Sequence, residues 1–467
     1  MNIAIILLAA GQGRRMKSDL PKVLQPLAGK PLLRHVIDTA VTIGPKSLHV
    51  VYGHGGDLVR EQLADAPVTS WILQAEQLGT GHAVQQALPA LQDDDIVLVL
   101  YGDVPLVRAE TLRQLLSLAG PEVIGLLTVM LQDPTGYGRV VRDDTDRVVA
   151  IVEQKDATSE QRSIIEGNTG VMAIPVKPLR RWLGCLRKAN TQGEYYLTDI
   201  IAVAVTEGVK VAPLVASSVE EVQGVNDKLQ LAQLEAENRK VRARDLMLAG
   251  VTLIDPARID VRGTLTTGRD VLIDVNVIFE GKVTLGDRVH VGPNCVLRDC
   301  DVAADVRIYP NCVIEGARVG AGSIIGPFAR LRPGARLADE VHVGNFVEVK
   351  NSLMDTGAKA NHLAYVGDAT VGANANIGAG TIIANYDGAN KHQTVIGADV
   401  HTGSNSVLVA PITVGEGATV GAGSTVTKTV PAGKLTVARA RQVTLDGWKR
   451  PQKNVYKVSY NKNCDDS

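Results

Sequence analysis

The chain has few aromatic residues, little net charge and no long apolar run. Aromatic residues make up 3% of its 467 residues, and the formal net charge at pH 7 is -1. A balanced charge gives no sign of a surface for nucleic acid or for an anionic membrane. The apolar run at residues 3–10 is too short to span a bilayer, and it lacks the basic flank and cleavage site of a signal peptide. We therefore expect a cytoplasmic protein with no nucleic-acid partner and no membrane insertion.

Cysteine is also scarce. The five cysteines are Cys185, Cys295, Cys300, Cys312 and Cys464. Their number is odd and no pair shows CxxC spacing, so neither a disulfide framework nor a zinc site is supported. Cys295 and Cys312 fall at inward positions of the repeat described next, where packing in the core is their expected role.

Residues 285–426 repeat with a period of six, as in LGDRVH-VGPNCV, IGPFAR-LRPGAR and VGEGAT-VGAGST. A fixed short period indicates one small unit stacked many times. Three hexads close a triangular coil, and stacked coils bury their aliphatic rows in parallel ladders. A β-sandwich would need hairpin signals between strands spaced about 8 to 12 residues apart, and these are missing. The repeat predicts a parallel β-helix, whose narrow interior also fits the scarcity of aromatic rings.

The first half of the sequence shows no six-residue repeat and follows a different pattern. Aliphatic runs at 3–8, 48–52 and 96–101 are separated by helical patterns such as LLRHVIDTAV and HAVQQALPAL. Alternating strands and helices predict an α/β Rossmann-like domain, with a parallel sheet covered by helices on both faces.

A polar helical segment lies between the two halves. Asn226 or Asp227 is placed to cap its start, and Gly250 to end it. We therefore divide the chain into a nucleotide-type domain at 1–226, a linker helix at 227–250, and a β-helix with a C-terminal tail at 251–467. The tail after Trp448 is basic and polar, and it is expected either to cover a neighbouring site or to fray.

A glycine-containing turn follows the first strand, in LAAGQGRRMKSDLPKVL. Gly11 and Gly13 would let the backbone approach a phosphate, while Arg15 and Lys22 would supply positive charge. Met16 replaces the third glycine of a dinucleotide fingerprint, and the GK[ST] ending of a P-loop is absent. The alternative is an ordinary strand-to-helix turn with surface cations.

Asp103 ends the aliphatic strand of IVLVLYGDVP, at the edge where open α/β sheets bind ligands. A hard oxygen ligand there suits Mg²⁺ bridging nucleotide phosphates, whereas the alternative is an Asx turn before Pro105. Asn226 is either a second metal ligand or a helix cap. In QAEQLGTGHA, the amide and backbone groups of Gln74, Gly79 and Thr80 would read a base edge; His82 alone there favours packing.

The hexad beat breaks once, because Val349 and Val371 lie 22 residues apart. This break predicts a loop extruded from the coil, and such loops usually have a use. It carries His362 and Tyr365. A lone histidine in a loop is more often solvated or hydrogen-bonded than catalytic, but the nearby sequence holds further polar groups, which are Arg332, Glu348, Lys350, Asn376, Asn385, Tyr386 and Ser404.

Motifs across the chain resemble those of the sugar-1-phosphate nucleotidyltransferases: LAAGxGxRM with PKVL, then QLGTGHA, YGDVPL, DPTGYGR, VEQKDA, NTG and GEYYLTD, in this order. Together with the hexads they resemble the bacterial bifunctional branch, and the resemblance covers nearly the whole chain. It implies a left-handed coil, a homotrimer and two reactions. Glucosamine-1-phosphate would be acetylated by acetyl-CoA, and UMP would then pass from UTP to N-acetylglucosamine-1-phosphate with release of pyrophosphate.

For the first domain, the resemblance implies catalysis by positioning and charge, with Arg15 and Lys22 neutralising the UTP phosphates. Asp103 and Asn226 would hold Mg²⁺. The implied UTP and UDP-N-acetylglucosamine contacts are Leu8, Ala9, Ala10, Gly11, Lys22, Gln74, Gly79, Thr80, Tyr101, Gly102, Asp103, Gly138, Glu153, Asn168 and Asn226. One departure is Arg14, where the family commonly has threonine.

For the β-helix, the resemblance implies that His362 is the general base for acyl transfer. A group that titrates near neutrality suits removal of a proton from the attacking amine. Arg332, Lys350, Tyr365 and Asn376 would bind glucosamine-1-phosphate. Acetyl-CoA would contact Ala379, Asn385, Tyr386, Ser404, Ala422 and Arg439. Asn385 or Ser404 would polarise the thioester carbonyl; their alternatives are ladder capping and a turn hydroxyl. Glu348 either orients a substrate group or faces solvent.

Two other interpretations stay open from the sequence. One is a single-activity nucleotidyltransferase whose β-helix serves only assembly or regulation. The other is a nucleotide-sugar-binding module on a structural trimer, which would bind without turnover. The NHLAYVGD segment, with Lys350 and Asn385-Tyr386, favours two reactions, because a scaffold has no need of it.

Overall fold

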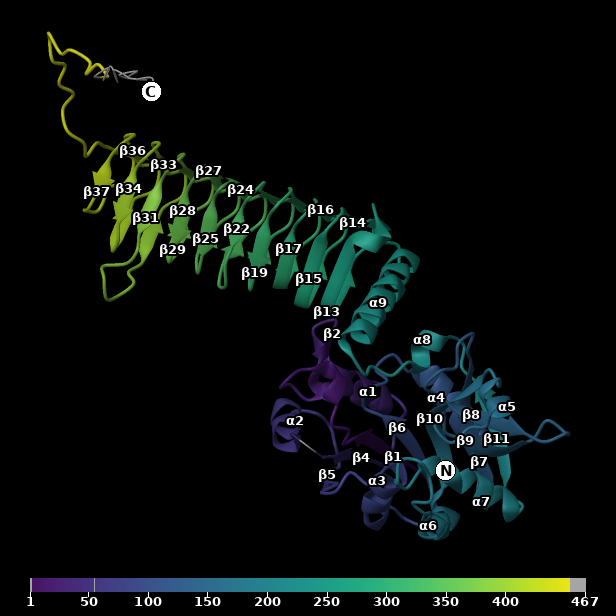
Figure 1. The fold of residues 1–467 in the computed structure, drawn as a ribbon. Coiled ribbons are helices and arrows are strands. Elements are labelled where there is room, and N and C mark those ends of the chain that lie inside the picture. Colours follow the sequence, from purple (N-terminus) through teal and green to yellow (C-terminus); the bar gives the residue numbers. More distant parts are fainter. Residues whose placement is uncertain (1, 54, 454–467) are drawn as a thin grey trace, which may run out of the picture.

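The computed structural model describes residues 2–53 and 55–453 (Figure 1). Aliphatic runs of the first half form a nine-stranded sheet with the main order β11-β7-β10-β6-β1-β4-β5. These strands are β1 (Asn2–Ala9), β4 (Ser47–Tyr52), β5 (Ser70–Leu73), β6 (Asp95–Tyr101), β7 (Val123–Met130), β10 (Glu166–Pro175) and β11 (Lys210–Val215). The strands expected at 3–8, 48–52 and 96–101 are confirmed as β1, β4 and β6.

The expectation of a fully parallel sheet is wrong at β10, which runs antiparallel to both β6 and β7. The connection from β7 to β10 is a hairpin of β8 (Gly138–Arg142) and β9 (Val148–Val152), followed by the single-turn α5 (Ser159–Arg162). A parallel return needs a crossover over one face of the sheet. This connection makes none, so β10 pairs antiparallel.

Helices cover both faces of the sheet, as expected. Helices α1 (Leu32–Val41) and α4 (Ala109–Leu118) pack into the core on one face. Helices α3 (Thr80–Ala87), α6 (Val176–Cys185) and α7 (Ile200–Thr206) pack into the core on the other. The buried residues of α1 recur at helical spacing, since Leu33, Val36, Ile37 and Ala40 share its inner side. The short α2 (Gly56–Gln62) and α8 (Val219–Val222) complete this region.

Helix α9 (Lys228–Leu248) joins the two halves. The Asp227 side chain caps its start by accepting from the Gln230 backbone N–H at 2.8 Å. After the helix ends, Gly250 adopts a φ of 98°, which favours glycine. Most of the helix is polar, but Leu234 packs with Met16, Leu27 and Leu32 of the first domain, whereas Ala243 joins the β-helix core. One helix therefore contacts both cores.

The second half winds into stacked coils from β12 (Thr252–Leu253) to β38 (Leu435–Thr436), seen in Figure 1 as a long prism. The paired strands along the stack are parallel, with Ile273 opposite Val291 and Val343 opposite Ala360. Because Ile273 and Val291 lie 18 residues apart, one coil holds three hexads, as expected. The stack begins before residue 285, where the six-residue repeat starts in the sequence. Strands β13 (Ile259–Thr267) and β15 (Val277–Leu285) already pair there as long parallel strands.

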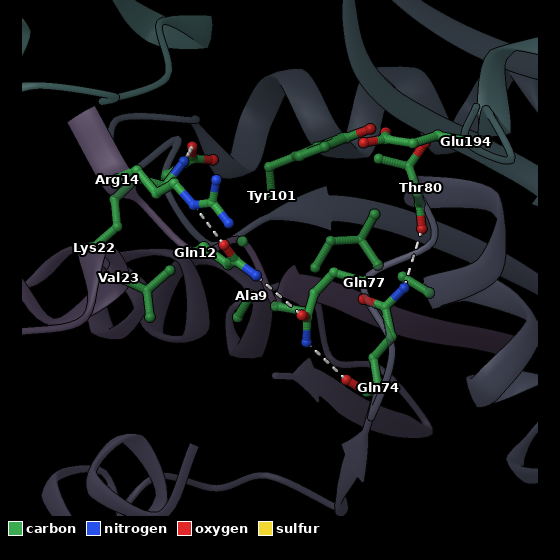
Figure 2. Close-up of a pocket in the computed structure, with 16 residues that line it drawn as sticks. Ala9, Gln12, Arg14, Lys22, Val23, Gln74, Gln77, Thr80, Tyr101 and Glu194 are labelled. Carbon is green, nitrogen blue, oxygen red and sulfur yellow. Dashed lines mark hydrogen bonds and ion pairs between the residues drawn. The ribbon is translucent and has the colours of Figure 1, made fainter. Parts of the chain in front are cut away.

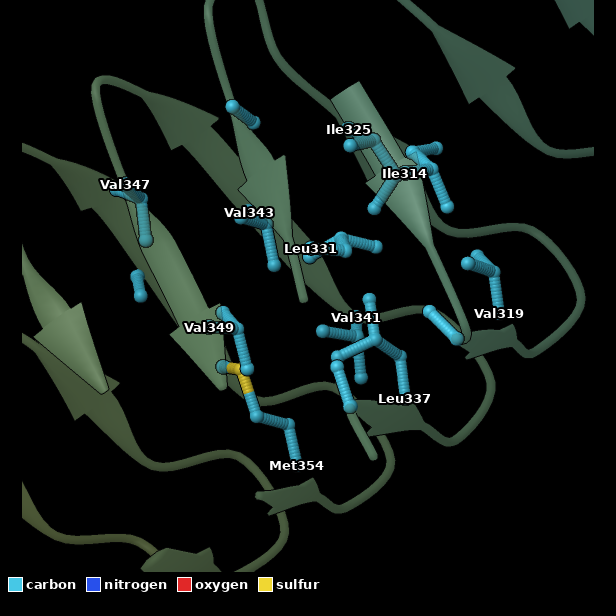
Figure 3. Packing of buried hydrophobic residues seen from close by; sticks show 14 of the residues in the cluster. Ile314, Val319, Ile325, Leu331, Leu337, Val341, Val343, Val347, Val349 and Met354 are labelled. Carbon is cyan, nitrogen blue, oxygen red and sulfur yellow. The ribbon is translucent and has the colours of Figure 1, made fainter. Parts of the chain in front are cut away.

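Aliphatic side chains fill the prism in rows. Figure 3 shows Leu331, Leu337, Val343, Val349 and Met354 pointing to one interior, and each is at most 4% exposed. The rows form one continuous cluster through the coils. Removing this much apolar surface from water is the main force that holds the repeat together.

The corners of the coils require left-handed backbone. Asn294, Asn311 and Asn405 have φ values of 60°, 63° and 55°, a conformation that asparagine tolerates well. Phe328 and Phe346 take up the same conformation at one corner of two successive coils, each with φ 56°. Their rings stack at 5.2 Å and are 49% and 56% exposed.

The loop expected between Val349 and Val371 is wrong. Met354, Ala360 and Val366 are all 0% exposed, so the chain keeps its inward positions through this stretch. The strands are β26 (Leu353–Met354), β27 (Lys359–His362), β28 (Tyr365–Gly367) and β29 (Ala369–Val371). The same side of two successive coils is one residue short, since Val349 pairs with Val366 and Met354 with Val371, which shifts the six-residue period without extruding a loop. The loop that does leave the prism is residues 385–393, between β31 (Ile382–Ala384) and β32 (Thr394–Ile396) (Figure 1).

The expected core role of two cysteines is confirmed, since Cys295 and Cys312 are both 0% exposed. Within residues 2–53 and 55–453 all cysteines are free thiols, while Cys464 and the tail from 454 lie outside the described residues. None of the described helices is long and apolar enough to cross a membrane.

Candidate active sites

A cavity of about 600 Å³ opens at the carboxyl ends of β1 and β6 (Figure 2). Because strands of one parallel sheet end at the same edge, the loops that follow them meet there. Its lining includes many of the residues expected from the sequence, namely Leu8, Ala9, Ala10, Gly11, Lys22, Gln74, Gly79, Thr80, Tyr101 and Asp103. Gln12, Arg14, Val23, Gln77, Ala83 and Glu194 also line it and were not expected as ligand contacts.

The turn after β1 is tightly packed. Gly13 has a φ of 61°, and a Cβ at this position would lie 2.7 Å from the Cβ of Lys22. Arg14 Nε donates to Gln12 Oε1 at 2.8 Å, and Gln12 in turn contacts Gln77 (Figure 2). Arg14 faces the cavity, whereas Arg15 is exposed in the same turn and does not line it.

Gln74 and its neighbours form the opposite wall. The Gln74 side chain is 3% exposed, and its Nε2 donates to the carbonyl of Gly79 at 3.1 Å. A Cβ on Gly79 would lie 2.5 Å from the Tyr195 carbonyl oxygen, so only glycine fits. Thr80 accepts from the Leu197 backbone N–H at 3.0 Å. These contacts fix amide and backbone groups at the cavity edge.

The expected sugar-side residues adjoin one another near Tyr101, which lines the cavity. Burial raises the pKa of Tyr101, and burial also raises the pKa of the Glu153 carboxyl, to which Thr198 donates at 3.1 Å. Gly138 lies against Glu153, and Asn168 accepts from the Gly170 backbone N–H at 3.0 Å. The structure thus gathers these residues, although Gly138, Glu153 and Asn168 are not on the cavity lining.

The side-chain oxygens of Asp103 and Asn226 converge on Lys22, which lines this cavity. Lys22 Nζ forms an ion pair with Asp103 Oδ2 and lies 3.3 Å from Asn226 Oδ1. The side chains of Lys22 and Asp103 are 13% and 15% exposed. A carboxylate and an amide oxygen that share one cation are the donor types that Mg²⁺ takes from protein when phosphates supply the rest. The pair therefore fits a divalent metal.

The second candidate site lies on a corner of the β-helix. His362 ends β27 and is exposed, and its Nδ1 lies 2.7 Å from Oδ1 of Asn345 in the preceding coil. Asn345 was not expected; its position 17 residues before His362, one shortened coil, is the signal that would have found it. An oxygen acceptor at Nδ1 keeps the proton there and leaves Nε2 as the basic nitrogen.

The expected acetyl-CoA positions stack above His362 on the same corner. The His362 carbonyl accepts from Gly380 N–H, the Ala379 carbonyl from Asn405, and the Ser404 carbonyl from Gly423. Arg439 Nη1 donates to the Ala422 carbonyl at 2.6 Å. Residues scattered over 78 positions of sequence, from 362 to 439, thereby form one column.

The face beside this column is rich in paired charges. Arg332 pairs with Glu348 at 2.9 Å and Lys350 with Asp368 at 3.3 Å. Burial alone would raise the pKa of Asp368, but hydrogen bonds from Asn351, Asn385 and Lys350 lower it overall. Asn385 Nδ2 also lies 3.5 Å from the Tyr365 hydroxyl. Asp368 therefore links two of the expected residues, Lys350 and Asn385, and was not itself expected.

The extruded loop adds a cation to this face. Lys391 lies beside Lys350, and the proximity of Lys350, with Arg332 further off, lowers the pKa of Lys391. Three positive side chains therefore converge there. Tyr386, in the same loop, is 61% exposed and donates to the Gly388 carbonyl at 2.6 Å. Asn376 begins β30 (Asn376–Ile377), in register with Lys359, and the described residues give it no side-chain bond to this group.

Comparison with known proteins gives matches in both halves. Residues 5–165 match the MobA-like NTP transferase domain, and residues 393–428 match the bacterial transferase hexapeptide. A protein of Azoarcus sp. (strain BH72), named bifunctional protein GlmU, is 58% identical over 449 residues, covering 96% of this chain and 99% of that protein. The chain belongs to the bifunctional GlmU family.

Two further GlmU proteins match equally well. That of Stutzerimonas stutzeri is 57% identical over 97% of this chain and 100% of its own length, and that of Ralstonia pickettii is 59% identical over 96% and 98%. A solved nucleotidyl transferase from Methanothermobacter aligns with 50% of this chain and 97% of its own length, at 19% identity and a TM-score of 0.37.

Membership of the GlmU family confirms the resemblance drawn from the motifs, and with it the left-handed form of the β-helix. The chain is an enzyme with uridyltransferase and acetyltransferase activities in UDP-N-acetylglucosamine synthesis. It acts on small molecules, and its nucleotidyltransferase half uses a nucleotide together with a divalent metal. The interpretations with one activity or none are thereby set aside.

Proposed function

We propose that the two reactions run at the two sites described above, acetyl transfer at the His362 corner and uridylyl transfer in the cavity of the first domain. The observation that carries the first assignment is the hydrogen bond between His362 Nδ1 and Asn345. It leaves Nε2 on an exposed surface as the nitrogen free to accept a proton. The domain division at 1–226, 227–250 and 251–467 is part of this proposal.

In acetyl transfer, the amine nitrogen of glucosamine-1-phosphate attacks the thioester carbon of acetyl-CoA. The new C–N bond replaces the C–S bond, the amine proton passes to His362 Nε2, and the CoA sulfur leaves as a thiolate. Arg332, Lys350 and Lys391 surround the place for the sugar phosphate, and charge-assisted bonds to it would orient the amine. Tyr365 and Asn376 are assigned to the same substrate.

Acetyl-CoA is assigned to the column above His362, which consists of Ala379, Ser404, Ala422 and Arg439, together with Asn385 and Tyr386 beside it. The column runs along one corner in successive coils, as an extended cofactor requires. Asn385 is committed to Asp368. This contact favours Ser404, which is exposed, as the donor to the thioester carbonyl.

In uridylyl transfer, a phosphate oxygen of N-acetylglucosamine-1-phosphate attacks the α-phosphorus of UTP in line, and pyrophosphate leaves. Lys22 and Arg15 are assigned to charge neutralisation, with Arg14 as a further cation on the lining. Asp103 and Asn226 would hold Mg²⁺, which supplies charge neutralisation at the phosphates when bound. Gln74, Gly79 and Thr80 would hold uracil, and Gly138, Glu153 and Asn168 the sugar.

Assembly and location belong to the same proposal. We assign a homotrimer, and the exposed, stacked Phe328 and Phe346 near the His362 corner support burial against another copy. Free thiols, including the exposed Cys185, support a reducing cytoplasm. Light scattering would test the trimer, and a monomer with full acetyl transfer would contradict it.

The assignment of the two reactions to the two sites is tested by giving glucosamine-1-phosphate, acetyl-CoA, UTP and Mg²⁺ to the parent protein and to His362→Ala. The products are followed by mass spectrometry. The parent is expected to form UDP-N-acetylglucosamine. The variant is expected to form it only when N-acetylglucosamine-1-phosphate is supplied. Full acetyl transfer by His362→Ala would remove the base assignment.

A further inference from the structure

The ammonium of Lys22 occupies the position between the two oxygens assigned to the metal. Its Nζ forms an ion pair with Asp103 Oδ2 and lies 3.3 Å from Asn226 Oδ1. Both oxygens are therefore already satisfied by a cation from the chain itself. A carboxylate that is paired in this way presents no net charge to an incoming metal ion.

The backbone and Cβ of Lys22 are held in place, while its ammonium group can reach either of two positions. Lys22 begins the short helix η2 (Lys22–Leu24), and the Gly13 backbone packs against its Cβ. Only the outer part of the four-carbon side chain is left to swing. Lys22 also lines the cavity, together with Gly11, Gln12 and Arg14 of the turn assigned to phosphate. The same ammonium thus reaches Asp103 or the phosphate region from one anchored stem.

We propose that Lys22 is an internal counter-ion, which fills the cation position of Asp103 and Asn226 until a nucleotide triphosphate draws its ammonium away. Metal binding at this position is then coupled to nucleotide binding, because the nucleotide removes the competing charge. This inference rests on the metal and phosphate assignments of the proposed function and adds a role for Lys22 in the nucleotide-free protein.

Mn²⁺ binding to the nucleotide-free, full-length protein tests the competition, with free Mn²⁺ followed by its electron paramagnetic resonance signal. Lys22→Met keeps the length of the stem and removes the charge. We expect it to bind Mn²⁺ at least roughly tenfold more tightly than the parent, the size of effect typical of a close charge partner. Adding Asp103→Asn to Lys22→Met should abolish the gain.

A matched control separates this contact from the general field of the turn. Lys17 is exposed in the same turn, and Lys17→Met removes the same charge without touching Asp103. It should leave Mn²⁺ affinity within about twofold of the parent. An equal gain in Lys17→Met and Lys22→Met would overturn the proposal. Far-ultraviolet circular dichroism checks that each variant is folded, and Lys22→Gln replaces Lys22→Met if that variant is not.

A second measurement uses the unaltered protein. Amine labelling followed by peptide mass spectrometry should modify Lys22 faster with Mn²⁺ present, because the metal displaces the ammonium from Asp103. An unchanged labelling rate would overturn the proposal. Asp103-dependent Mn²⁺ binding that is equal in the parent and Lys22→Met overturns only the role of Lys22. If Asp103→Asn leaves Mn²⁺ binding unchanged in both the parent and Lys22→Met, the metal assignment is overturned as well.

Discussion

The two candidate sites differ in how the chain encloses them. In the first domain, loops from several strands close around a cavity of about 600 Å³, and residues such as Gln74 are 3% exposed there. On the β-helix, His362 stands on the outer corner of a coil, and Tyr386 is 61% exposed. One site is completed by the fold of a single chain. The other is an open surface in the described residues of the single chain.

The difference follows from how each fold places side chains. An open α/β sheet collects irregular loops at one edge, so each loop is free to shape a pocket. A β-helix has almost no loops, and its chemistry is carried by residues aligned in successive coils, such as Asn345 and His362. Changes at one site should therefore leave the other site intact.

The largest effect is expected at the exposed corner. Replacing His362 by alanine removes the group assigned to take the amine proton, so kcat for acetyl transfer should fall about 10²- to 10⁴-fold. Uridylyl transfer should be unchanged. His290→Ala, an exposed histidine on another coil, is the matched control and should keep both activities. CoA release measured by thiol titration distinguishes the variants, and an active His362→Ala would refute the base assignment.

Next in size is the effect of Asp103→Asn. Loss of the carboxylate weakens the proposed metal position, and uridylyl transfer should fall about 10²- to 10³-fold, as for other removed charge-stabilising groups. Acetyl transfer should persist at the parent rate. Asp144→Asn removes an exposed carboxylate of the same domain and serves as control. Pyrophosphate release is the measurement; a parallel loss of acetyl transfer would show that the sites are not independent.

Stability offers a third contrast. Leu331 is 0% exposed in the prism, and Leu331→Ala should reduce the stability of the β-helix by about 2 to 5 kcal/mol through lost burial and a cavity. Acetyl transfer should then be lost at a lower temperature, while uridylyl transfer keeps its parent inactivation temperature. Activity assays after heating would show this. If both activities fail together, the two cores unfold as one unit.

A smaller effect is expected when His362 loses only its partner. Asn345→Ala should lower kcat for acetyl transfer about tenfold, corresponding to the loss of one hydrogen bond. Asn345→Asp keeps an oxygen acceptor and should restore most of the rate, with an altered pH profile because the carboxylate favours the charged imidazole. A positioning role predicts this rescue, whereas equal loss in both variants would contradict it.

The smallest expected effect concerns Glu153. Its pKa is raised by burial, so the folded state holds its proton to higher pH than the unfolded chain does. Its contribution to stability therefore declines as pH rises from the ordinary carboxyl range through the raised value. Glu153→Gln should remove this decline and unfold at a slightly higher temperature at neutral pH. Thermal unfolding of both proteins at several pH values measures the difference, and parallel curves would contradict the sign.

How much the sequence predicted differs between the sites. In the first domain, most expected residues line or adjoin the cavity, because the binding groups sit in loops with recognisable motifs. Gln77 was missed although it lies within QAEQLG, since nothing in the sequence says which of its glutamines face inward. The antiparallel direction of β10 was missed because the sequence does not show that the hairpin before β10 replaces a crossover.

In the β-helix, the period predicted the fold, but the break between Val349 and Val371 was misinterpreted. One side shortened by one residue in two successive coils looks the same in the sequence as an insertion, since both shift the six-residue period. The true loop at 385–393 was hidden because Asn385 and Tyr386 still follow a regular strand. Asp368 and Lys391 were not predicted as site residues. Their roles depend on contacts with residues of neighbouring coils, which the sequence does not show.

Mixing the two disabled variants tests the central claim of two independent sites most directly. Asp103→Asn and His362→Ala would each receive glucosamine-1-phosphate, acetyl-CoA, UTP and Mg²⁺, alone and together. We expect Asp103→Asn alone to accumulate N-acetylglucosamine-1-phosphate, His362→Ala alone to form neither product, and the mixture to form UDP-N-acetylglucosamine. A mixture that stays inactive, with no N-acetylglucosamine-1-phosphate formed by Asp103→Asn, would contradict the assignment of separate sites.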